Sequence, residues 1–259
     1  MNLGRIWTVA SNVFLEVIRD RILYLVALFA VLMMAAAVLL PDISAGAQNK
    51  ITLDLGLGAI HLISVVVAVF VGTGLVNKEI DRRTVLVLLS KPVSRWEIIL
   101  GKHVGLSAVL AVLVALLTAV LLGVLLLNGI PFPWGSLLIA AGFMFVEAML
   151  ITAFAILFGV FTSSLLAILL TFAVYLMGHL SQDIVALGKL SETEGIQRIT
   201  NSLYLVLPDL ERFNLRNEAI YGMQLIPSTW ELSTHLLYGL LYIGLLLVIS
   251  LVIFSRRQF

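Results

Sequence analysis

Glu147 is the one formal charge that lies deep inside a long apolar run of this sequence, so it is the first candidate for chemistry. A charge at the centre of a bilayer costs about 2.5–3.5 kcal/mol on insertion scales, so the side chain must face a bundle interior or a wet cavity, or be protonated. Two interpretations stay open: a residue of a substrate path or proton relay, and a protonated Glu hydrogen-bonded to a neighbouring helix. The expected partners at similar depth are Ser64, Thr118, Thr171 and Tyr175.

The chain lacks the residue patterns of common catalytic and metal sites. It contains no cysteine, which excludes disulfides, thiolate metal ligands and cysteine nucleophiles. It contains no G-x-x-x-x-G-K-[ST], H-E-x-x-H or G-x-S-x-G motif. The four histidines, His61, His103, His179 and His235, are scattered without ligand spacing. We therefore expect no catalytic residue, no metal, no bound cofactor and no nucleic-acid partner.

The composition is that of a membrane protein. Of the 259 residues, 61% are apolar and 12% are charged, which is about half the charged share of a soluble domain. Six apolar runs approach the ~20 residues that a transmembrane helix needs. They predict an all-α polytopic protein with a single transmembrane domain over residues 1–259. The expected spans are about 22–40, 57–76, 104–127, 137–160, 163–180 and 236–254.

Lysine and arginine placement predicts the orientation of these spans. With the N-terminus inside, the cytoplasmic segments hold 11 of the 16 Lys and Arg residues, as the positive-inside rule requires. Both termini are therefore expected to be cytoplasmic. Residues 1–21 predict an amphipathic helix, with Trp7 and Phe14 on the apolar face and Arg5 on the other. Such a helix suits the membrane interface; packing on other protein is the alternative.

The segment between the second and third spans, residues 77–103, holds 6 of the 16 Lys and Arg residues. Pro92 ends one helix, and Ser94-x-x-Glu97 is a capping box that begins the next. The expected shape is a helix, a sharp turn, a short helix and then the membrane. A basic, apolar and capped segment of this length favours a docking site for another protein over a plain loop.

The segment 181–235 is expected to be an extracytoplasmic loop. It carries seven acidic residues against four basic ones, and Pro208 and Pro227 interrupt it. Two interpretations stay open for this loop: a simple cap on the helix bundle, and an outer gate or partner-docking surface. The residues that would serve the second role are Asp209, Glu211 and Arg212.

The run Leu88-Leu89-Ser90-Lys91-Pro92-Val93-Ser94-Arg95 carries a resemblance to a known family. Together with Glu79 and Arg83-Thr84 before it and Gly101-Lys102 after it, this run resembles ABC transporter permeases of the type-2 exporter (ABC-2) family. It looks closest to the NosY-like branch of multi-copper-enzyme-maturation permeases. The elbow helix ending at Arg21, the segment Pro208–Asn214 and the basic ending Phe254–Phe259 resemble the same family. Arg83 departs from the pattern, because many members have Gly before Thr.

The resemblance implies a non-catalytic permease subunit of an exporter in the bacterial cytoplasmic (inner) membrane. Two permeases would pair, as a homodimer or a heterodimer, and two copies of a separate ATPase would bind ATP and Mg²⁺. That ATPase would dock on the coupling segment 77–103, with a smaller contact at Phe161–Ser164. The implied coupling residues are Glu79, Arg83, Lys91, Pro92, Ser94, Arg95, Trp96 and Glu97. The substrate path would lie between the permeases, along the second and fifth spans.

Three other functions compete with this one. An ABC-type mechanotransmission subunit would act on an extracytoplasmic partner through 181–235 without transport, and it shares every sequence feature with the exporter. A secondary transporter would favour several mid-membrane charges and broken helices, whereas this chain has only Glu147. An intramembrane enzyme is disfavoured by the missing nucleophile and metal motifs.

Overall fold

The computed structural model describes residues 3–18, 23–43, 48–81, 94–190, 195, 197, 198, 200, 202, 204 and 207–256. The elements in this part of the chain are all helices, which confirms the all-α prediction. In chain order they are α1 (Leu3–Val17), α2 (Leu23–Ile43), α3 (Gln48–Asp81), α5 (Arg95–Leu127), α6 (Trp134–Phe161), α7 (Ser164–His179), α8 (Ser181–Leu190), the 3₁₀ helix η2 (Leu210–Phe213), α10 (Arg216–Tyr221) and α11 (Thr229–Arg256).

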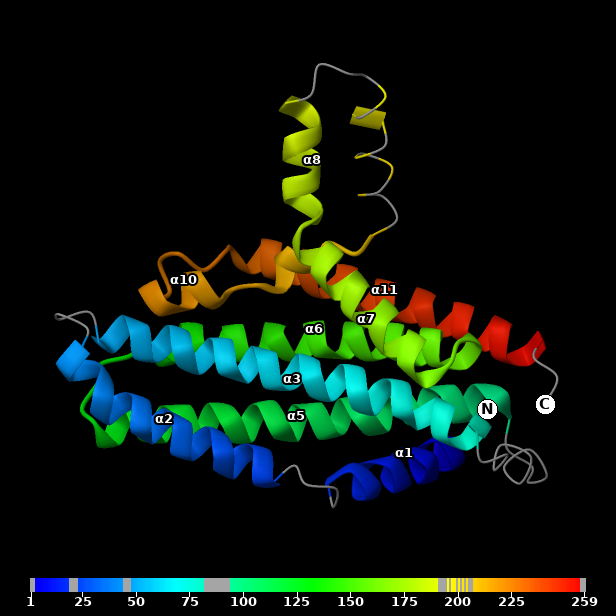
Figure 1. Cartoon of the computed structure of the whole chain (residues 1–259), viewed down its shortest axis with the longest axis horizontal. Helices are drawn as coiled ribbons and strands as arrows, with labels where there is room; N and C mark the ends of the chain where they lie inside the picture. Colours follow the sequence, from blue (N-terminus) through cyan, green and yellow to red (C-terminus); the bar gives the residue numbers. More distant parts are fainter. Residues whose placement is uncertain are drawn as a thin grey trace.

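The long helices lie side by side along one axis and form a bundle (Figure 1). Four of them, α3, α5, α6 and α11, are long and apolar enough to cross a membrane. A fifth crossing is reached only if α7 and α8, which are bent by 55° relative to each other, count as one. The apolar part of α2, Tyr24–Leu40, is shorter. The chain is therefore a multi-pass membrane protein, with four or five such helices in its described part.

The fifth predicted span, about residues 163–180, overlaps α7 and is short for a membrane crossing. α7 has 16 residues and is about 24 Å long, short of the ~30 Å hydrocarbon core. The chain turns by 55° immediately after it, and α8 projects from the side of the bundle (Figure 1). The bend falls where the apolar run ends, because Leu180 is followed by the polar residues Ser181, Gln182 and Asp183.

α6 is the central helix of the bundle. It contacts α3, α5, α7, α10, α11 and η2, and its buried residues face several directions around the helix. Small side chains allow these helices to approach closely, as is usual inside membranes. A Cβ atom built on Gly72 of α3 would lie 2.8 Å from Cβ of Ala155 in α6. Polar residues on α6 therefore face other helices.

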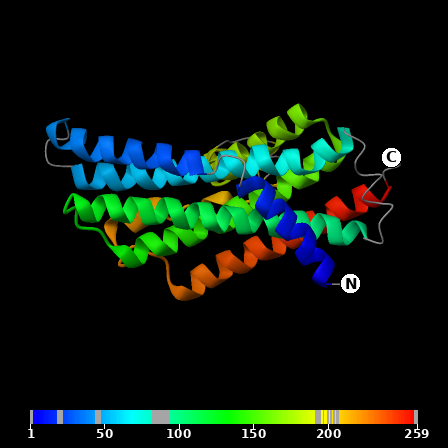
Figure 2. The same cartoon turned by 90° about the horizontal axis from the view of Figure 1, so that it is seen from below.

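The N-terminal helix α1 packs across the start of α5 (Figure 2). Ala10 and Val13 are buried in this contact, whereas Leu3 and Trp7 are 74% and 72% exposed. The helix thus packs on protein along one edge and leaves apolar residues uncovered along another. A Cβ atom on Gly105 of α5 would lie 2.7 Å from the carbonyl oxygen of Ala10, so α1 can dock here only on a glycine.

Gly105→Ala is expected to weaken the docking of α1 on α5. The new methyl group would collide with the backbone of α1, and overpacking of this kind costs about 1–3 kcal/mol. Gly123→Ala is the matched control on the same helix, because its Cβ would have no neighbour within 4 Å. Thermal unfolding of the detergent-solubilised protein and limited proteolysis of α1 measure the effect. Equal stability of the two variants would contradict the packing described.

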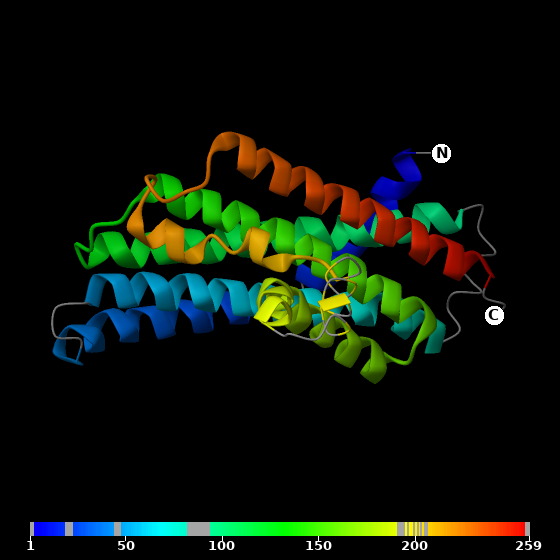
Figure 3. The ribbon, with the colours of Figure 1, turned by 90° about the horizontal axis from the view of Figure 1, so that it is seen from above.

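Part of the expected outer loop is built into the bundle. Figure 3 shows η2 and α10 lying along the long helices; η2 packs on α6 and α7, and α10 packs on α3 and α6. Leu210, Phe213, Leu215 and Ala219 are buried in the hydrophobic core. The Ser136 hydroxyl of α6 donates a hydrogen bond to the Ala219 carbonyl, with an O–O distance of 2.7 Å. Over these residues the segment is a packed layer of the fold.

Candidate functional site

A buried polar cluster lies where α3, α6 and α7 meet. His61, Glu147 and His179 each come from a different one of these helices. The His61 Nε2 atom lies 3.0 Å from both carboxylate oxygens of Glu147, and the His179 Nε2 atom lies 2.9 Å from Glu147 Oε1. Their side chains are 5%, 1% and 17% exposed, respectively. We call these three residues the His–Glu–His cluster.

The cluster corrects the interpretation of the histidines as isolated residues. His61 and His179 lie 86 and 32 residues from Glu147 in the sequence, so no local spacing could reveal them. The available signal was that both histidines fall inside predicted apolar runs, where a polar side chain needs a partner. The Tyr175 ring completes the surroundings, with its centroid 4.9 Å from that of His179.

Of the four partners that the sequence suggested for Glu147, Tyr175 lies against the cluster through its ring, whereas the other three make different contacts. Ser64 and Thr171 each donate to a carbonyl four residues earlier in their own helix, at 2.7 Å. Thr118 instead lines a groove between α5 and α6. Glu147 faces the bundle interior, and its functional role stays a prediction.

A chain of polar contacts leads from the cluster towards the surface. The His179 Nδ1 atom lies 3.2 Å from Glu211 Oε2, and the Glu211 side chain is 42% exposed. Asn214 donates to the other Glu211 oxygen at 2.9 Å, and Arg216 donates to Asn214 Oδ1 at 2.9 Å. The buried carboxylate of Glu147 is thereby connected to a polar cavity of about 390 Å³. That cavity is lined by Gln182, Glu211, Arg212, Asn214, Leu215, Glu218, Pro227 and His235.

Asp209 and Arg212 stabilise the start of η2. Asp209 is buried and accepts hydrogen bonds from Gln182, from Tyr204 and from Arg212 Nε, the last at 3.0 Å. The Arg212 guanidinium also stacks over the Tyr238 ring, 5.0 Å from its centroid. The Tyr204 hydrogen bond and, next, the Asp209 charge raise the pKa of Arg212. These contacts give Asp209 and Arg212 a structural role in holding η2 in place.

The end of the bundle where α3 ends and α5 begins also receives the first turns of α1 and the last turn of α11 (Figures 1 and 2). We call it the coupling end. The capping box predicted at Ser94 is present there: Ser94 N–H donates to Glu97 Oε2 at 2.9 Å, and Glu97 N–H donates to the Ser94 hydroxyl at 3.3 Å. The sequence predicted a short helix here that ends before the third span. The helix instead continues without a break to Leu127.

The predicted coupling residues fall in different situations at this end. Glu79 lies in the last turns of α3, and Arg83, Lys91 and Pro92 lie outside the described residues. The Arg95 guanidinium donates to the carbonyls of Phe254 and Ser255 at 2.6 and 2.8 Å. Arg5 lies 3.9 Å from the buried Glu97 carboxylate. The start of α5 is therefore tied to both α1 and α11.

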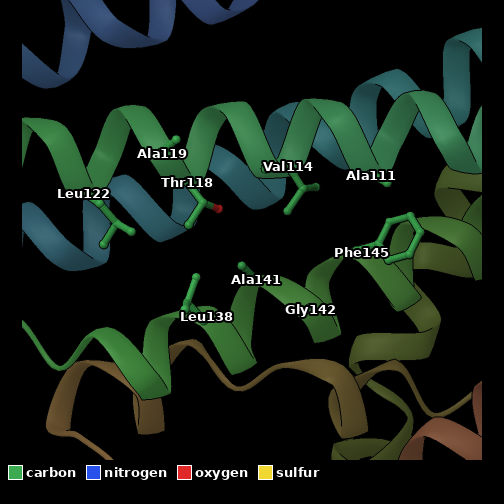
Figure 4. Close-up of a pocket in the computed structure, with 10 residues that line it drawn as sticks. Ala111, Val114, Thr118, Ala119, Leu122, Leu138, Ala141, Gly142 and Phe145 are labelled. Atoms are coloured by element: carbon green, nitrogen blue, oxygen red, sulfur yellow. The ribbon is translucent and has the colours of Figure 1, made fainter.

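A separate apolar groove of about 360 Å³ lies between α5 and α6. Small residues such as Ala115 and Gly142 line it, and Figure 4 shows Thr118 among them. The buried Thr118 hydroxyl has no hydrogen-bond partner within the described part of the chain.

Comparison with known families covers almost the whole chain. Residues 7–259 match the ABC-2 family transporter proteins. The chain belongs to the ABC-2 transporter family. No curated protein matches its sequence. This match confirms the ABC-2 family that the sequence predicted. Membership of that family implies association with a membrane and with an ABC ATPase. The His–Glu–His cluster and the coupling end are two separate candidate sites in this ABC-2 transporter protein.

Proposed function

We propose that this protein is the membrane-spanning permease subunit of an ATP-driven exporter. The observation that carries the proposal is the ABC-2 family match over residues 7–259. Because the sequence has no phosphate-binding loop, ATP and Mg²⁺ would bind to a separate ATPase chain. This subunit would itself be non-catalytic. Two ATPase copies and a second permease would complete the complex, and the run 88–95 suggests the NosY-like branch.

The proposed topology has six spans, with α2 and the bent α7–α8 pair as the first and fifth. Both termini would be cytoplasmic, at the inner membrane of a bacterium. The Lys and Arg distribution supports this orientation. It is consistent with the positions of α1 and of the last turn of α11 at one end of the bundle.

The ATPase would dock at the coupling end. α3 and α5 have 34 and 33 residues and are each about 50 Å long, well beyond the ~30 Å hydrocarbon core. A force applied at Ser94 would move α5 as one rigid helix. The contacts of Arg95 with α11 and of Glu97 with Arg5 would carry that movement to two further helices. The continuous helix thus supports mechanical coupling from the ATPase to the spans.

Trp96→Ala is expected to weaken ATPase association several-fold while the permease still inserts and folds. Trp96 is half-buried at the coupling end, and aromatic side chains are frequent anchors of protein interfaces. Trp134→Ala is the matched control, because Trp134 is an exposed tryptophan at the start of α6. Pull-down of the ATPase with tagged permease measures the ratio of the two chains. If Trp96→Ala retained the ATPase fully, Trp96 would not belong to the interface.

The function itself is tested on the complex purified from native membranes. A chain with a phosphate-binding loop should co-purify, and its ATP hydrolysis should depend on the permease. Purification of the intact permease without such a chain, under conditions that preserve known ABC complexes, would overturn the proposal. Transport in reconstituted vesicles then separates an exporter from a mechanotransmission subunit, because the latter would hydrolyse ATP without moving a substrate.

A further inference from the structure

We propose that the His–Glu–His cluster binds one divalent transition-metal ion, such as Zn²⁺, in the interior of the helix bundle. The ligands would be Nε2 of His61, a carboxylate oxygen of Glu147 and Nε2 of His179. Two imidazoles and one carboxylate form a common donor set for such ions. The proposal concerns the permease alone and does not depend on the function proposed above.

The donor atoms are already close to the spacing that an ion needs. One candidate ligand atom from each residue lies within 4.8 Å of the other two. Bonds of about 2.1 Å to Zn²⁺ place tetrahedral ligands about 3.4 Å apart, and the present N–O contacts are 2.9 and 3.0 Å. An ion would therefore fit after each N–O contact lengthens by about half an ångström and the two imidazole nitrogens, which lie within 4.8 Å of each other, settle at about the same spacing. Side-chain rotation can supply that change without moving the helices.

A second carboxylate orients one of the ligands. Glu211 Oε2 lies 3.2 Å from the His179 Nδ1 atom, which is the carboxylate–histidine arrangement that supports metal-binding imidazoles. A neutral imidazole has a single N–H group, so His179 cannot donate to both Glu211 and Glu147. With the proton on Nδ1 facing Glu211, the Nε2 lone pair points at the centre of the cluster. A metal ion there is a better partner for that lone pair than the Glu147 oxygen.

The polar cavity beside the cluster would be the entry route for a cation. Glu211 belongs both to the support of His179 and to the lining of the polar cavity of about 390 Å³. Glu218 and His235 also line that cavity. One carboxylate oxygen of Glu218 and the Nδ1 atom of His235 are buried without a hydrogen-bond partner among the described residues. Unpaired buried acceptors of this kind are costly, and a passing cation would satisfy them.

The direct test is cobalt and zinc binding by the full-length permease in detergent, after metal removal with a chelator. Co²⁺ should give the visible ligand-field bands of nitrogen and oxygen coordination, with one ion per chain. Zn²⁺ should displace it. His61→Ala and His179→Ala should each abolish these bands. Glu211→Gln should keep the site but weaken it about 10- to 100-fold.

His103→Gln is the matched control. His103 is also a buried histidine, but its Nε2 atom contacts the Met149 carbonyl at 3.1 Å, away from the cluster. This variant should bind one Co²⁺ with the wild-type spectrum. Gel filtration and circular dichroism establish that each variant is folded. The proposal is overturned if folded wild-type protein binds no stoichiometric metal, or if binding survives in both His61→Ala and His179→Ala.

Discussion

The double variant His61→Leu, His179→Leu is expected to be about 3–5 kcal/mol less stable than the wild-type protein in the absence of metal. The two substitutions leave the Glu147 carboxylate, which is 1% exposed, without its hydrogen-bond partners. Removing the partners of a buried ionic group costs about this much, because the remaining charge stays desolvated. Equilibrium unfolding with a denaturing detergent, followed by circular dichroism in the presence of a chelator, measures the difference.

A third substitution should reverse this loss. Glu147→Leu in the double variant removes the unpaired carboxylate, and an apolar replacement of a whole buried ionic group is often neutral or stabilising. The triple variant should therefore recover most of the lost stability. Glu16→Gln, at an exposed position of α1, controls for the loss of one acidic group. A triple variant that is less stable than the double variant would show that the side-chain volumes, not the buried charge, decide stability here.

Local features of this protein could be predicted from the sequence, because their physical causes are local. The capping box needs only Ser94 and Glu97, three residues apart, and it forms as predicted. The end of α5 at Leu127 is set by the Asn-Gly and proline-rich turn that follows it, and Gly129 there has a positive φ of 64°. The length of an apolar run likewise gives the number of residues that a helix can offer to a membrane.

The His–Glu–His cluster could not be predicted in the same way. Its formation depends on which faces of α3, α6 and α7 meet, and that is decided by packing of small residues such as Gly72 against Ala155. A shift of one residue in any of these helices would rotate a ligand by 100° away from the centre. For η2, the sequence left open both a simple cap on the helix bundle and an outer gate or docking surface, because its acidic and basic residues are also typical of a solvated loop. Their charges are instead paired, as in Asp209 with Arg212.

Phe213→Ala is expected to be about 3–5 kcal/mol less stable than the wild-type protein, the usual cost of removing a fully buried phenylalanine. The Phe213 side chain is fully buried, and its ring centroid lies 6.3 Å from that of Tyr238 and 6.4 Å from that of Phe143. A Cβ atom on Gly239 would lie 3.0 Å from the same ring. The ring therefore joins η2 to both α6 and α11, and its loss leaves a cavity among three elements.

The same change tests whether residues 207–222 act as a loop or as part of the bundle. Leu225→Ala is the control, since Leu225 lies just beyond α10 and is 56% exposed; its stability should stay within about 0.5 kcal/mol of wild type. Phe213→Leu should recover part of the loss, because it refills much of the cavity. Both are measured by the same equilibrium unfolding. If Phe213→Ala were as stable as Leu225→Ala, η2 would not belong to the packed core. Glu211 would then lack the fixed position from which it orients His179.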